Sequence, residues 1–391
     1  MKKGLPLLIN GILLIIFGLL AVYSVSIYES FSLSLKLGWD PTNYYYFQQQ
    51  ISSLFYVAVA VFIVWKFPLR VLKTHKFAVV VLVGAFLLQL LVFVPGIGIE
   101  LNGAKGWLSI PGLPSIQPSE FFKLAYVLFM SSWLIRKREM MKTTEFLINF
   151  VIMSALLYAV FLLIPDLWTV LIMGGTAIIM VRYGGLSIRK TIAILAIGLG
   201  AGVFAGFSLA VINPKMSYVR DRFSYFFTTD AEKKKEERER TGWQTEQALI
   251  AIGGGGFWGQ GYGKGLQKFW YIPEAQSDFI FAAFSEEVGF VGNLLLVVLY
   301  CWLFFYFLKH LQHIKDPQSR MIGVGIVSLL MVQAFVNIGV NIQILPSTGV
   351  TLPFVSAWGS SLMICCIELM LLYRILRSED KKTVLPPVSN A

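Results

Sequence analysis

Long apolar runs alternate with short polar segments along almost the whole chain. Each run is close to the ~20 residues that an α-helix needs to cross about 30 Å of hydrocarbon. The runs lack the residue-by-residue alternation of a membrane β-barrel. Backbone groups in lipid must be hydrogen-bonded within their own segment, so the runs predict helices. About ten membrane-spanning helices are expected, near residues 5–27, 48–66, 77–95, 120–135, 147–164, 167–182, 190–213, 279–308, 321–345 and 354–376.

The composition excludes a soluble globular protein. Of the 391 residues, 56% are hydrophobic, and the mean hydropathy is +0.69. We therefore predict an all-α polytopic membrane protein that forms a single integral membrane domain over residues 1–391. The N-terminal Met-Lys-Lys and the apolar run after it are similar to a signal peptide. That run is too long and lacks a small-x-small cleavage site, which predicts a retained first helix.

Lysine and arginine concentrate in every second short loop. This bias predicts that these loops are cytoplasmic, together with both termini and a tail over residues 378–391. The cations are scattered over several loops, so the formal net charge of +11 does not predict nucleic-acid binding. The residues that carry the bias are Lys2, Lys3, Lys66, Arg70, Lys73, Lys76, Arg136, Lys137, Arg138, Lys142, Arg182, Arg189, Lys190, Lys309, Lys315, Arg320, Arg374, Arg377, Lys381 and Lys382.

One polar segment, residues 214–277, is much longer than an ordinary loop. It is predicted to be an extracytoplasmic loop between the seventh and eighth helices. Residues 231–240 mix both charge signs at helical spacing, which favours a solvated surface helix or a flexible insert. The glycines over residues 253–265 are predicted to let main-chain N–H groups approach a ligand. No strand–turn–helix unit surrounds them, so they are not a dinucleotide-binding motif.

The cysteines and histidines do not point to metal or nucleophilic chemistry on the outer face. Cys301, Cys365 and Cys366 all fall inside predicted spans and have no metal-like spacing. His75, His310 and His313 all lie near the cytoplasmic face, so a serine triad on the outer face has no support.

Acidic residues in or near the predicted spans are the main candidates for a functional site. An ionisable group costs free energy to place in a membrane, so its presence there indicates a function. Asp278 lies where the long loop returns to apolar sequence. Glu120 and Lys123 share one helix face and are expected to pair. Asp166 either caps the sixth helix or lies beside a substrate. Glu286 and Glu287 are each expected to pair with a partner inside the bundle.

Several motifs, in order along the chain, resemble the SEDS family of shape, elongation, division and sporulation proteins (FtsW, RodA and SpoVE). The resemblance covers nearly the whole chain. The matching segments are Val22–Ser26, Asn102–Trp107, Gln117–Glu120 with Lys123, Pro165–Leu167, Pro273–Phe281 with Glu286–Gly289, Asn337–Gly339, Leu345–Pro346, Thr348–Gly349, Leu352–Ser356 and Gly359–Ser361.

The chain also departs from the family pattern at several positions. Gly106 stands where the family has a second arginine, and Trp168 and Trp358 stand where it has glycines. Gln343 and Ile344 replace a Gly-Leu pair. Two tryptophans in place of glycines predict local repacking or a narrower cavity. The segments 22–26 and 273–278 look more like the FtsW division branch than the RodA elongation branch.

The resemblance implies a peptidoglycan glycosyltransferase. Such an enzyme polymerises lipid II into glycan strands at the outer face of the bacterial cytoplasmic membrane. Its implied partners are a class B penicillin-binding protein and other membrane proteins of the divisome or elongasome. The acceptor hydroxyl needs a general base, and Asp278 is the candidate, because a carboxylate partly removed from water is a stronger base.

The remaining candidates would bind the substrate, whose pyrophosphate needs cations or N–H donors. Lys105 and Arg220 are favoured among the outer cations, which also include Lys264 and Lys268. Trp107 either stacks on a sugar or anchors the chain at the interface. A magnesium or manganese ion held by Asp278 stays open as a cofactor. The predicted substrate-binding residues are Lys105, Trp107, Glu120, Lys123, Asp166, Arg220, Gln244 and Gln247.

Two other functions remain open. A lipid II flippase or transporter would suit many spans and intramembrane acids, but it would place its charges near mid-membrane with access from both sides. A non-catalytic scaffold would only position a penicillin-binding protein.

Overall fold

The computed structural model describes residues 3–101, 104–109, 115–164, 166–198, 226, 242–357 and 359–384. Eight helices in this part are long and apolar enough to cross a membrane, so the chain is a multi-pass membrane protein. They are α1 (Leu5–Val25), α3 (Tyr45–Lys66), α5 (His75–Leu90), which runs on into η1 (Leu91–Phe93), α7 (Thr144–Leu163), α8 (Leu167–Gly184), α13 (Ile280–Leu311), α14 (Pro317–Asn341) and α15 (Gly359–Val384).

A further long helix, α6 (Pro118–Arg136), matches the predicted fourth span. It begins at Pro118, as the fixed φ of proline favours at a first helical turn. Most of its residues are buried, including Glu120 and Lys123. It is not among the eight helices above, and it carries the charged residues Glu120, Lys123 and Arg136.

Short elements connect the long helices. They are α2 (Ile27–Lys36), α4 (Leu69–Leu72), the antiparallel strands β1 (Gly98–Leu101) and β2 (Ala104–Leu108), η2 (Arg138–Lys142) and α12 (Trp243–Gly255). A helix over residues 188–198 covers the start of the predicted seventh span. The rest of that span and the charged segment 231–240 lie outside the described residues.

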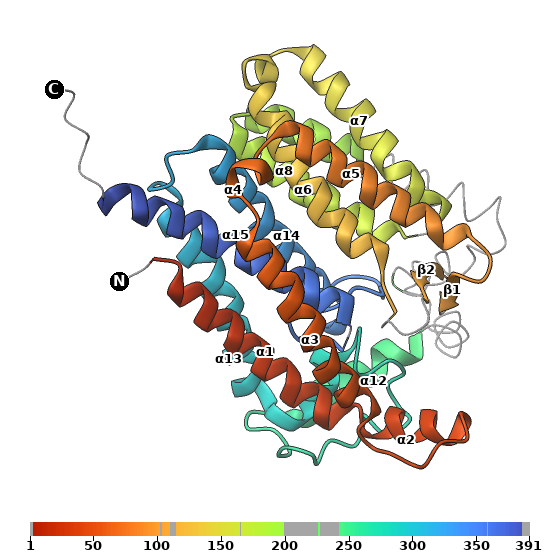
Figure 1. Cartoon of the computed structure of the whole chain (residues 1–391). Coiled ribbons are helices and arrows are strands. Elements are labelled where there is room, and N and C mark those ends of the chain that lie inside the picture. The colour runs from red at the N-terminus through yellow and green to blue at the C-terminus, as the bar shows by residue number, and fades with distance from the viewer. Residues whose placement is uncertain are drawn as a thin grey trace.

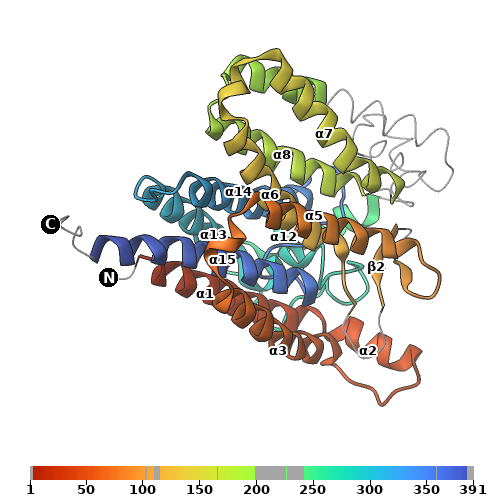
Figure 2. The same cartoon turned by 45° about the horizontal axis from the view of Figure 1, so that its top comes forward.

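The long helices form two groups that share α14. Helices α1, α3, α13 and α15 pack together, and α5, α6, α7 and α8 pack together beside them (Figures 1 and 2). Helix α14 contacts both groups, through α6 and α8 on one side and α13 and α15 on the other. Most of its residues are therefore buried. Neither α2 nor the β1–β2 hairpin was expected from the apolar pattern.

The outward faces of the long helices are apolar. Large side chains there are exposed in the isolated chain, among them Phe55 at 69%, Val80 at 67% and Leu156 at 69%. Such surfaces fit hydrocarbon and not water, which agrees with membrane-spanning helices.

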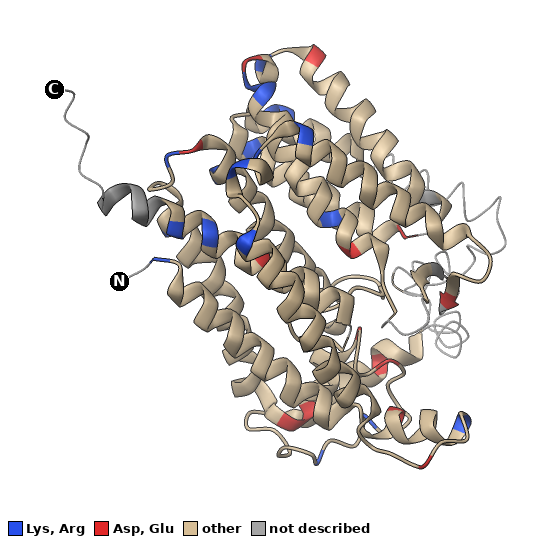
Figure 3. Cartoon of the chain, viewed as in Figure 1, with Lys and Arg blue, Asp and Glu red and all other residues tan. Residues whose placement is uncertain are grey.

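Charges separate along the bundle. Most lysines and arginines of the described chain lie at the end where the two termini are found (Figure 3). Lys73 there pairs with Asp316 at 2.7 Å, and Asp316 also caps α14 through Ser319. Burial tends to raise the pKa of Asp316, but the hydrogen bonds from Lys73 and Ser319 outweigh it and lower this pKa below its usual value.

Helix α13 was predicted as one continuous span over 279–308, but it is broken at Gly289. This residue has φ 64° and ψ −166°, a backbone conformation that favours glycine. The break leaves main-chain groups without helical partners, and residues 256–261 supply new ones. Phe290 N donates to Gly256 O at 2.9 Å, and Gln260 N donates to Glu286 O at 2.9 Å.

Glycines make this insertion sterically feasible. A β-carbon on Gly289 would overlap the backbone nitrogen of Gly259 and lie 2.7 Å from the carbonyl carbon of Trp258. A β-carbon on Gly259 would in turn overlap the Glu287 carbonyl. The two chain segments therefore touch backbone to backbone, and neither glycine has room for a side chain.

Gly289→Ala is therefore expected to destabilise the protein by at least about 2 kcal/mol, through the unfavourable φ and the steric overlap. Thermal unfolding of the purified protein in detergent measures the effect. Gly253→Ala is the matched control, because a β-carbon there meets nothing within 4 Å. It should leave the stability unchanged or raise it by up to about 1 kcal/mol, the helical advantage of alanine. Equal melting temperatures for Gly289→Ala and the unmodified protein would contradict the proposed close packing.

Candidate functional site

Asp278 lies at the mouth of α13, two residues before the first residue of the helix, and is partly exposed. Its carboxylate is beside the 345–350 segment: a β-carbon on Gly349 would lie 3.5 Å from the Asp278 Oδ2 atom. The prediction of a carboxylate at the entrance to this helix is thus confirmed by the position of the residue.

The backbone around Asp278 is held by hydrogen bonds at three consecutive carbonyls. The Gln276 carbonyl accepts from Ala357 N at 3.0 Å, and the Ser277 carbonyl accepts from Ser356 Oγ at 2.7 Å. The Asp278 carbonyl accepts from the side-chain amides of α14, described below. Fixing the main chain on both sides of a side chain restricts where its carboxylate can go, which is what a catalytic group requires.

Two asparagines of α14 hold the Asp278 carbonyl. Asn337 Nδ2 and Asn341 Nδ2 donate to it at 2.9 and 3.0 Å. The two lie four residues apart and so share one helix face. Asn341 Oδ1 also accepts from Ala282 N at 3.0 Å, which satisfies an N–H of the first turn of α13 that has no helical partner. Both asparagines are almost completely buried.

Strained backbone gathers in the same segments. Four non-glycine residues of the described chain have positive φ, a conformation that is uncommon outside glycine. Trp270 and Glu274 precede Asp278, and Gln343 and Phe354 lie in the segment between α14 and α15 that packs around it. Strain of this kind concentrates at functional sites, where the surrounding contacts hold it.

A chain of polar side chains connects α6, through α14, with the segment between α14 and α15. Lys123 Nζ bonds Glu120 Oε1 at 2.8 Å and Gln333 Oε1 at 2.7 Å. Gln333 Nε2 donates to Thr351 Oγ1 at 3.1 Å, and that hydroxyl bonds Ser361 at 3.0 Å. The predicted Glu120–Lys123 pair is confirmed. The two side chains are only 6% and 4% exposed, so the pair lies inside the bundle.

A second buried ion pair holds the loop between α12 and α13. Lys268 Nζ bonds Glu287 Oε1 at 2.6 Å, and both side chains are fully buried. Ser24 of α1 donates to the same carboxylate at 2.7 Å, and Gly263 N donates at 2.8 Å. Lys268 was counted among the outer cations open to a phosphate. The structure corrects this, because its charge is used inside the bundle.

The glycines over residues 253–265 also differ from expectation. Their N–H groups were predicted to approach a ligand, but they bond within the protein. Gly259 N donates to Gly255 O, Gly261 N to Glu287 O and Gly263 N to the Glu287 carboxylate. The absence of side chains serves close packing against α13 instead. Glu286 is satisfied in the same way, by Gln267 N at 2.8 Å.

Helix α2 meets the loop that leads to Asp278. Tyr28 packs against Trp270 with ring centres 4.7 Å apart and the ring planes tilted by 37°. Burial and the charge of Glu274 raise the pKa of the Glu29 carboxyl above its usual value, while Lys36 opposes the shift.

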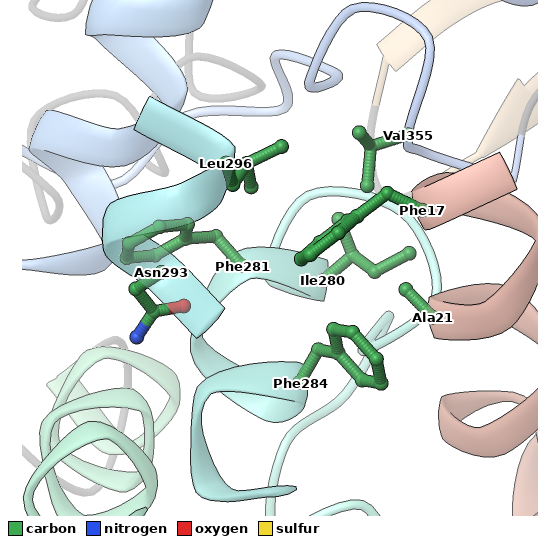
Figure 4. A pocket seen from close by; sticks show the side chains of 8 residues that line it. All are labelled: Phe17, Ala21, Ile280, Phe281, Phe284, Asn293, Leu296 and Val355. Atoms are coloured by element: carbon green, nitrogen blue, oxygen red, sulfur yellow. The ribbon is translucent and has the colours of Figure 1, made fainter. Parts of the chain in front are cut away.

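A narrow apolar crevice lies between α1 and α13, next to the break (Figure 4). Its lining begins two residues after Asp278 with Ile280 and includes one polar side chain, Asn293. Asn293 Oδ1 accepts from Ser285 Oγ at 3.1 Å. The remaining lining residues are Phe17, Ala21, Phe281, Phe284, Leu296 and Val355.

A family model described as cell cycle protein, for FtsW, RodA and SpoVE, matches residues 5–381. This chain belongs to the FtsW/RodA/SpoVE family. It is 33% identical over 382 residues to stage V sporulation protein E of Bacillus subtilis, covering 96% of this chain and 98% of that one. It is 33% identical over 376 residues to a probable peptidoglycan glycosyltransferase FtsW of Geobacter metallireducens, covering 96% and 94%.

Solved structures share the fold. A chain of a peptidoglycan synthase complex that coordinates polymerization and crosslinking superposes with a TM-score of 0.71 at 22% identity, covering 96% of this chain and 97% of that one. The rod shape determining protein RodA of Thermus thermophilus gives a TM-score of 0.66 at 23% identity, covering 96% of each chain.

The structure brings several FtsW/RodA/SpoVE motifs together around Asp278. Segment 273–281 carries the carboxylate, Asn337 belongs to the motif of α14, and Ser356 belongs to the motif before α15. The 117–120 motif reaches the same region, because Gln117 N donates to Ser360 Oγ at 3.3 Å. Motifs far apart in sequence thus form one connected polar unit.

The other predicted residues have mixed outcomes. Asp166 caps α8 by accepting from Thr169 N at 3.0 Å, which confirms the capping interpretation. Gln247 is buried on α12, and Gln244 is partly exposed there. The Lys105 backbone and a partly exposed Trp107 lie on β2. Arg220 and Trp358 lie outside the described residues. Direct substrate contact by any of these residues stays a prediction.

Sequence analysis missed the supporting groups. Asn337, Asn341, Gln333 and Ser356 were not assigned a role beyond the two motifs that contain Asn337 and Ser356. The available signal was that polar amides in an apolar helix require partners.

The Lys268–Glu287 pair generates a stability prediction. Lys268→Met should cost about 3–5 kcal/mol, because it leaves a buried carboxylate without its counter-charge. Adding Glu287→Gln should recover part of that loss, since the double variant carries no unpaired charge. Lys264→Met, at an exposed lysine of the same loop, is the control and should change stability by less than about 0.5 kcal/mol. Thermal unfolding of the unmodified protein and the three variants measures these differences. A double variant less stable than Lys268→Met would refute the pairing argument.

Proposed function

We propose that this protein is a peptidoglycan glycosyltransferase that polymerises lipid II, with Asp278 as the general base. The observation that carries the proposal is the partly exposed carboxylate of Asp278, on a backbone held at three successive carbonyls. The relatives named peptidoglycan glycosyltransferase FtsW, about one-third identical over nearly the whole chain, support the reaction class.

The chemistry follows from the needs of the two substrates. The 4-hydroxyl oxygen of the acceptor GlcNAc attacks the anomeric carbon of the donor MurNAc. Asp278 takes the hydroxyl proton as the new C–O bond forms. The bond between the anomeric carbon and the pyrophosphate oxygen breaks, and the electron pair leaves with undecaprenyl pyrophosphate. General-base assistance of this kind contributes on the order of 10²–10⁴ in rate.

The position of Asp278 suits a substrate that stays in the membrane. Asp278 lies at the end of a spanning helix, so a polyprenyl tail in the bilayer and a sugar at its surface can both be near it. We propose that this end is extracytoplasmic and that both termini are cytoplasmic. The gathering of lysine and arginine at the end with the termini supports this orientation in the bacterial cytoplasmic membrane (Figure 3).

The leaving pyrophosphate needs positive charge or N–H donors. We assign this role to Lys105 and Arg220, because Lys123 and Lys268 are both used in buried pairs. In the described part of the chain no group of three or more His, Cys, Asp or Glu side chains is assembled as a metal site. A magnesium or manganese ion at Asp278 would therefore take most of its ligands from phosphate oxygens and water, as magnesium commonly does.

We further propose a class B penicillin-binding protein as the partner, within the divisome or elongasome. The fold shared with a chain of a peptidoglycan synthase complex supports an assembly of this kind.

The proposal predicts that Asp278→Asn lowers lipid II polymerisation at least about 100-fold, the lower end of general-base assistance. Purified protein receives labelled lipid II, with and without the cognate penicillin-binding protein, and the glycan products are separated on a gel. Asparagine has almost the same shape as aspartate, so the variant should keep its melting temperature. Glu100→Gln, an exposed acid on β1, is the charge-matched control and should retain activity.

The same assay separates the other functions. A flippase or a scaffold gives no glycan with the unmodified protein under any condition. Full polymerisation activity of the Asp278→Asn variant would show that Asp278 is not the general base.

A further inference from the structure

Helix α2 buries small polar residues and exposes large apolar ones, which is the reverse of the usual arrangement in a surface helix. Ser30 and Ser34, one turn apart, are completely buried. Phe31 and Leu35, one turn apart on the adjoining face, are 40% and 53% exposed. A helix in water would expose its serines and bury its leucine and phenylalanine. The arrangement is stable only if the exposed face meets something apolar.

The buried serines have specific partners, so the orientation of α2 is fixed. Ser30 Oγ accepts from Tyr46 N at 3.3 Å, and Ser34 Oγ accepts from Thr42 N at 3.1 Å. These bonds satisfy main-chain donors near the beginning of α3, where a helix start leaves N–H groups unpaired. Rotating α2 to hide its apolar face would break both bonds.

The position of α2 along the chain defines its depth. The 21 residues of α1 rise about 31 Å at about 1.5 Å per residue, which matches the hydrocarbon thickness. Helix α2 begins at Ile27, two residues after α1 ends, and α3 begins at Tyr45. Residues 27–44 therefore lie at the boundary between hydrocarbon and headgroups.

Large apolar side chains are exposed on both sides of α2, at the end of α1 and in the segment that leads to α3. Leu20 and Tyr23 near the end of α1 are 50% and 38% exposed. Beyond α2, Leu37 and Trp39 are 51% and 49% exposed, and Tyr44 is 46% exposed. Tryptophan and tyrosine are characteristic of membrane interfaces.

We propose that α2 is an interfacial helix whose Phe31 and Leu35 lie in the acyl chains of the adjacent bilayer leaflet. The lipid surface, and not a protein, is the occupant, because α2 directly follows the lipid-facing helix α1 and lies at the boundary of the hydrocarbon. Ser32 and Lys36, on the next face of the helix, then face the aqueous headgroup region. Such helices bind in the interface plane by their apolar face.

The position of α2 in the interface also affects the loop that leads to Asp278. Tyr28 of α2 packs against Trp270 and Phe269, with ring centres 4.7 and 6.4 Å away. Trp270 is eight residues before Asp278. A helix held at a constant depth in the leaflet therefore holds the start of the segment that leads to Asp278. This relation does not depend on which reaction Asp278 performs.

Site-specific fluorescence quenching tests the proposal without any substrate. Leu35→Cys and Ser32→Cys are made in a variant whose native cysteines are replaced, labelled with bimane and placed in nanodiscs. Lipids with a nitroxide at carbon 5 should quench the label at 35 at least about twofold more than the label at 32, as an interfacial apolar face requires. Iodide in the buffer should give the reverse order. Leu20→Cys is the lipid-facing reference.

Two outcomes overturn the proposal. Equal access of iodide to both labels would show that the Phe31–Leu35 face is in water. Protection of the label at 35 from iodide and from nitroxide lipid alike would show that a protein surface covers it.

The link to the loop has its own measurement. Tyr28→Ala should speed amide hydrogen exchange in residues 269–277 several-fold, because it removes the ring contact with α2. Ser32→Ala, on the aqueous face, should leave that exchange unchanged. Unchanged exchange in Tyr28→Ala would show that α2 does not hold the loop.

Discussion

The site depends on one constraint: a peptide group inside a membrane cannot be left without a hydrogen-bond partner. Helix α13 is interrupted at Gly289, and the interruption releases main-chain donors and acceptors. Residues 256–261 replace the missing helical partners and form hydrogen bonds with α13 on both sides of the break. The loop that leads to Asp278 is therefore part of the helical bundle. Asp278 lies on the chain between this inserted segment and the first turn of α13, and its backbone is held at three successive carbonyls.

Two buried ion pairs strengthen this arrangement from different directions. Lys268 and Glu287 join the loop to α13 and, through Ser24, to α1. Glu120 and Lys123 join α6 to α14 through Gln333. Each pair carries hydrogen bonds from neighbouring groups, which a charge in a low-dielectric interior needs. The charges that could face a substrate are therefore fewer than the sequence alone indicates, and this narrows the cations available for a phosphate.

The sequence predicted the features that depend on local pattern. Apolar runs located most of the helices, a spacing of three residues indicated the Glu120–Lys123 pair, and Asp166 was placed at a helix start. The break at Gly289 was not predictable in this way, because a single glycine is tolerated in a membrane helix. Whether it breaks depends on a segment about thirty residues earlier in the chain. The burial of Lys268 was missed for the same reason, since its partners Glu287 and Ser24 are distant in sequence.

The bond between Ser24 and Glu287 also has a consequence for how the protein is made. The two residues are separated by 263 positions, so they belong to the first and eighth predicted spans. During synthesis α1 enters the membrane long before α13 exists, and Ser24 has no carboxylate to bond. The contact between Ser24 and α13 can therefore form only after α13 has been inserted. This contact forms late in biogenesis, and a chain that ends before α13 would leave Ser24 without its carboxylate partner.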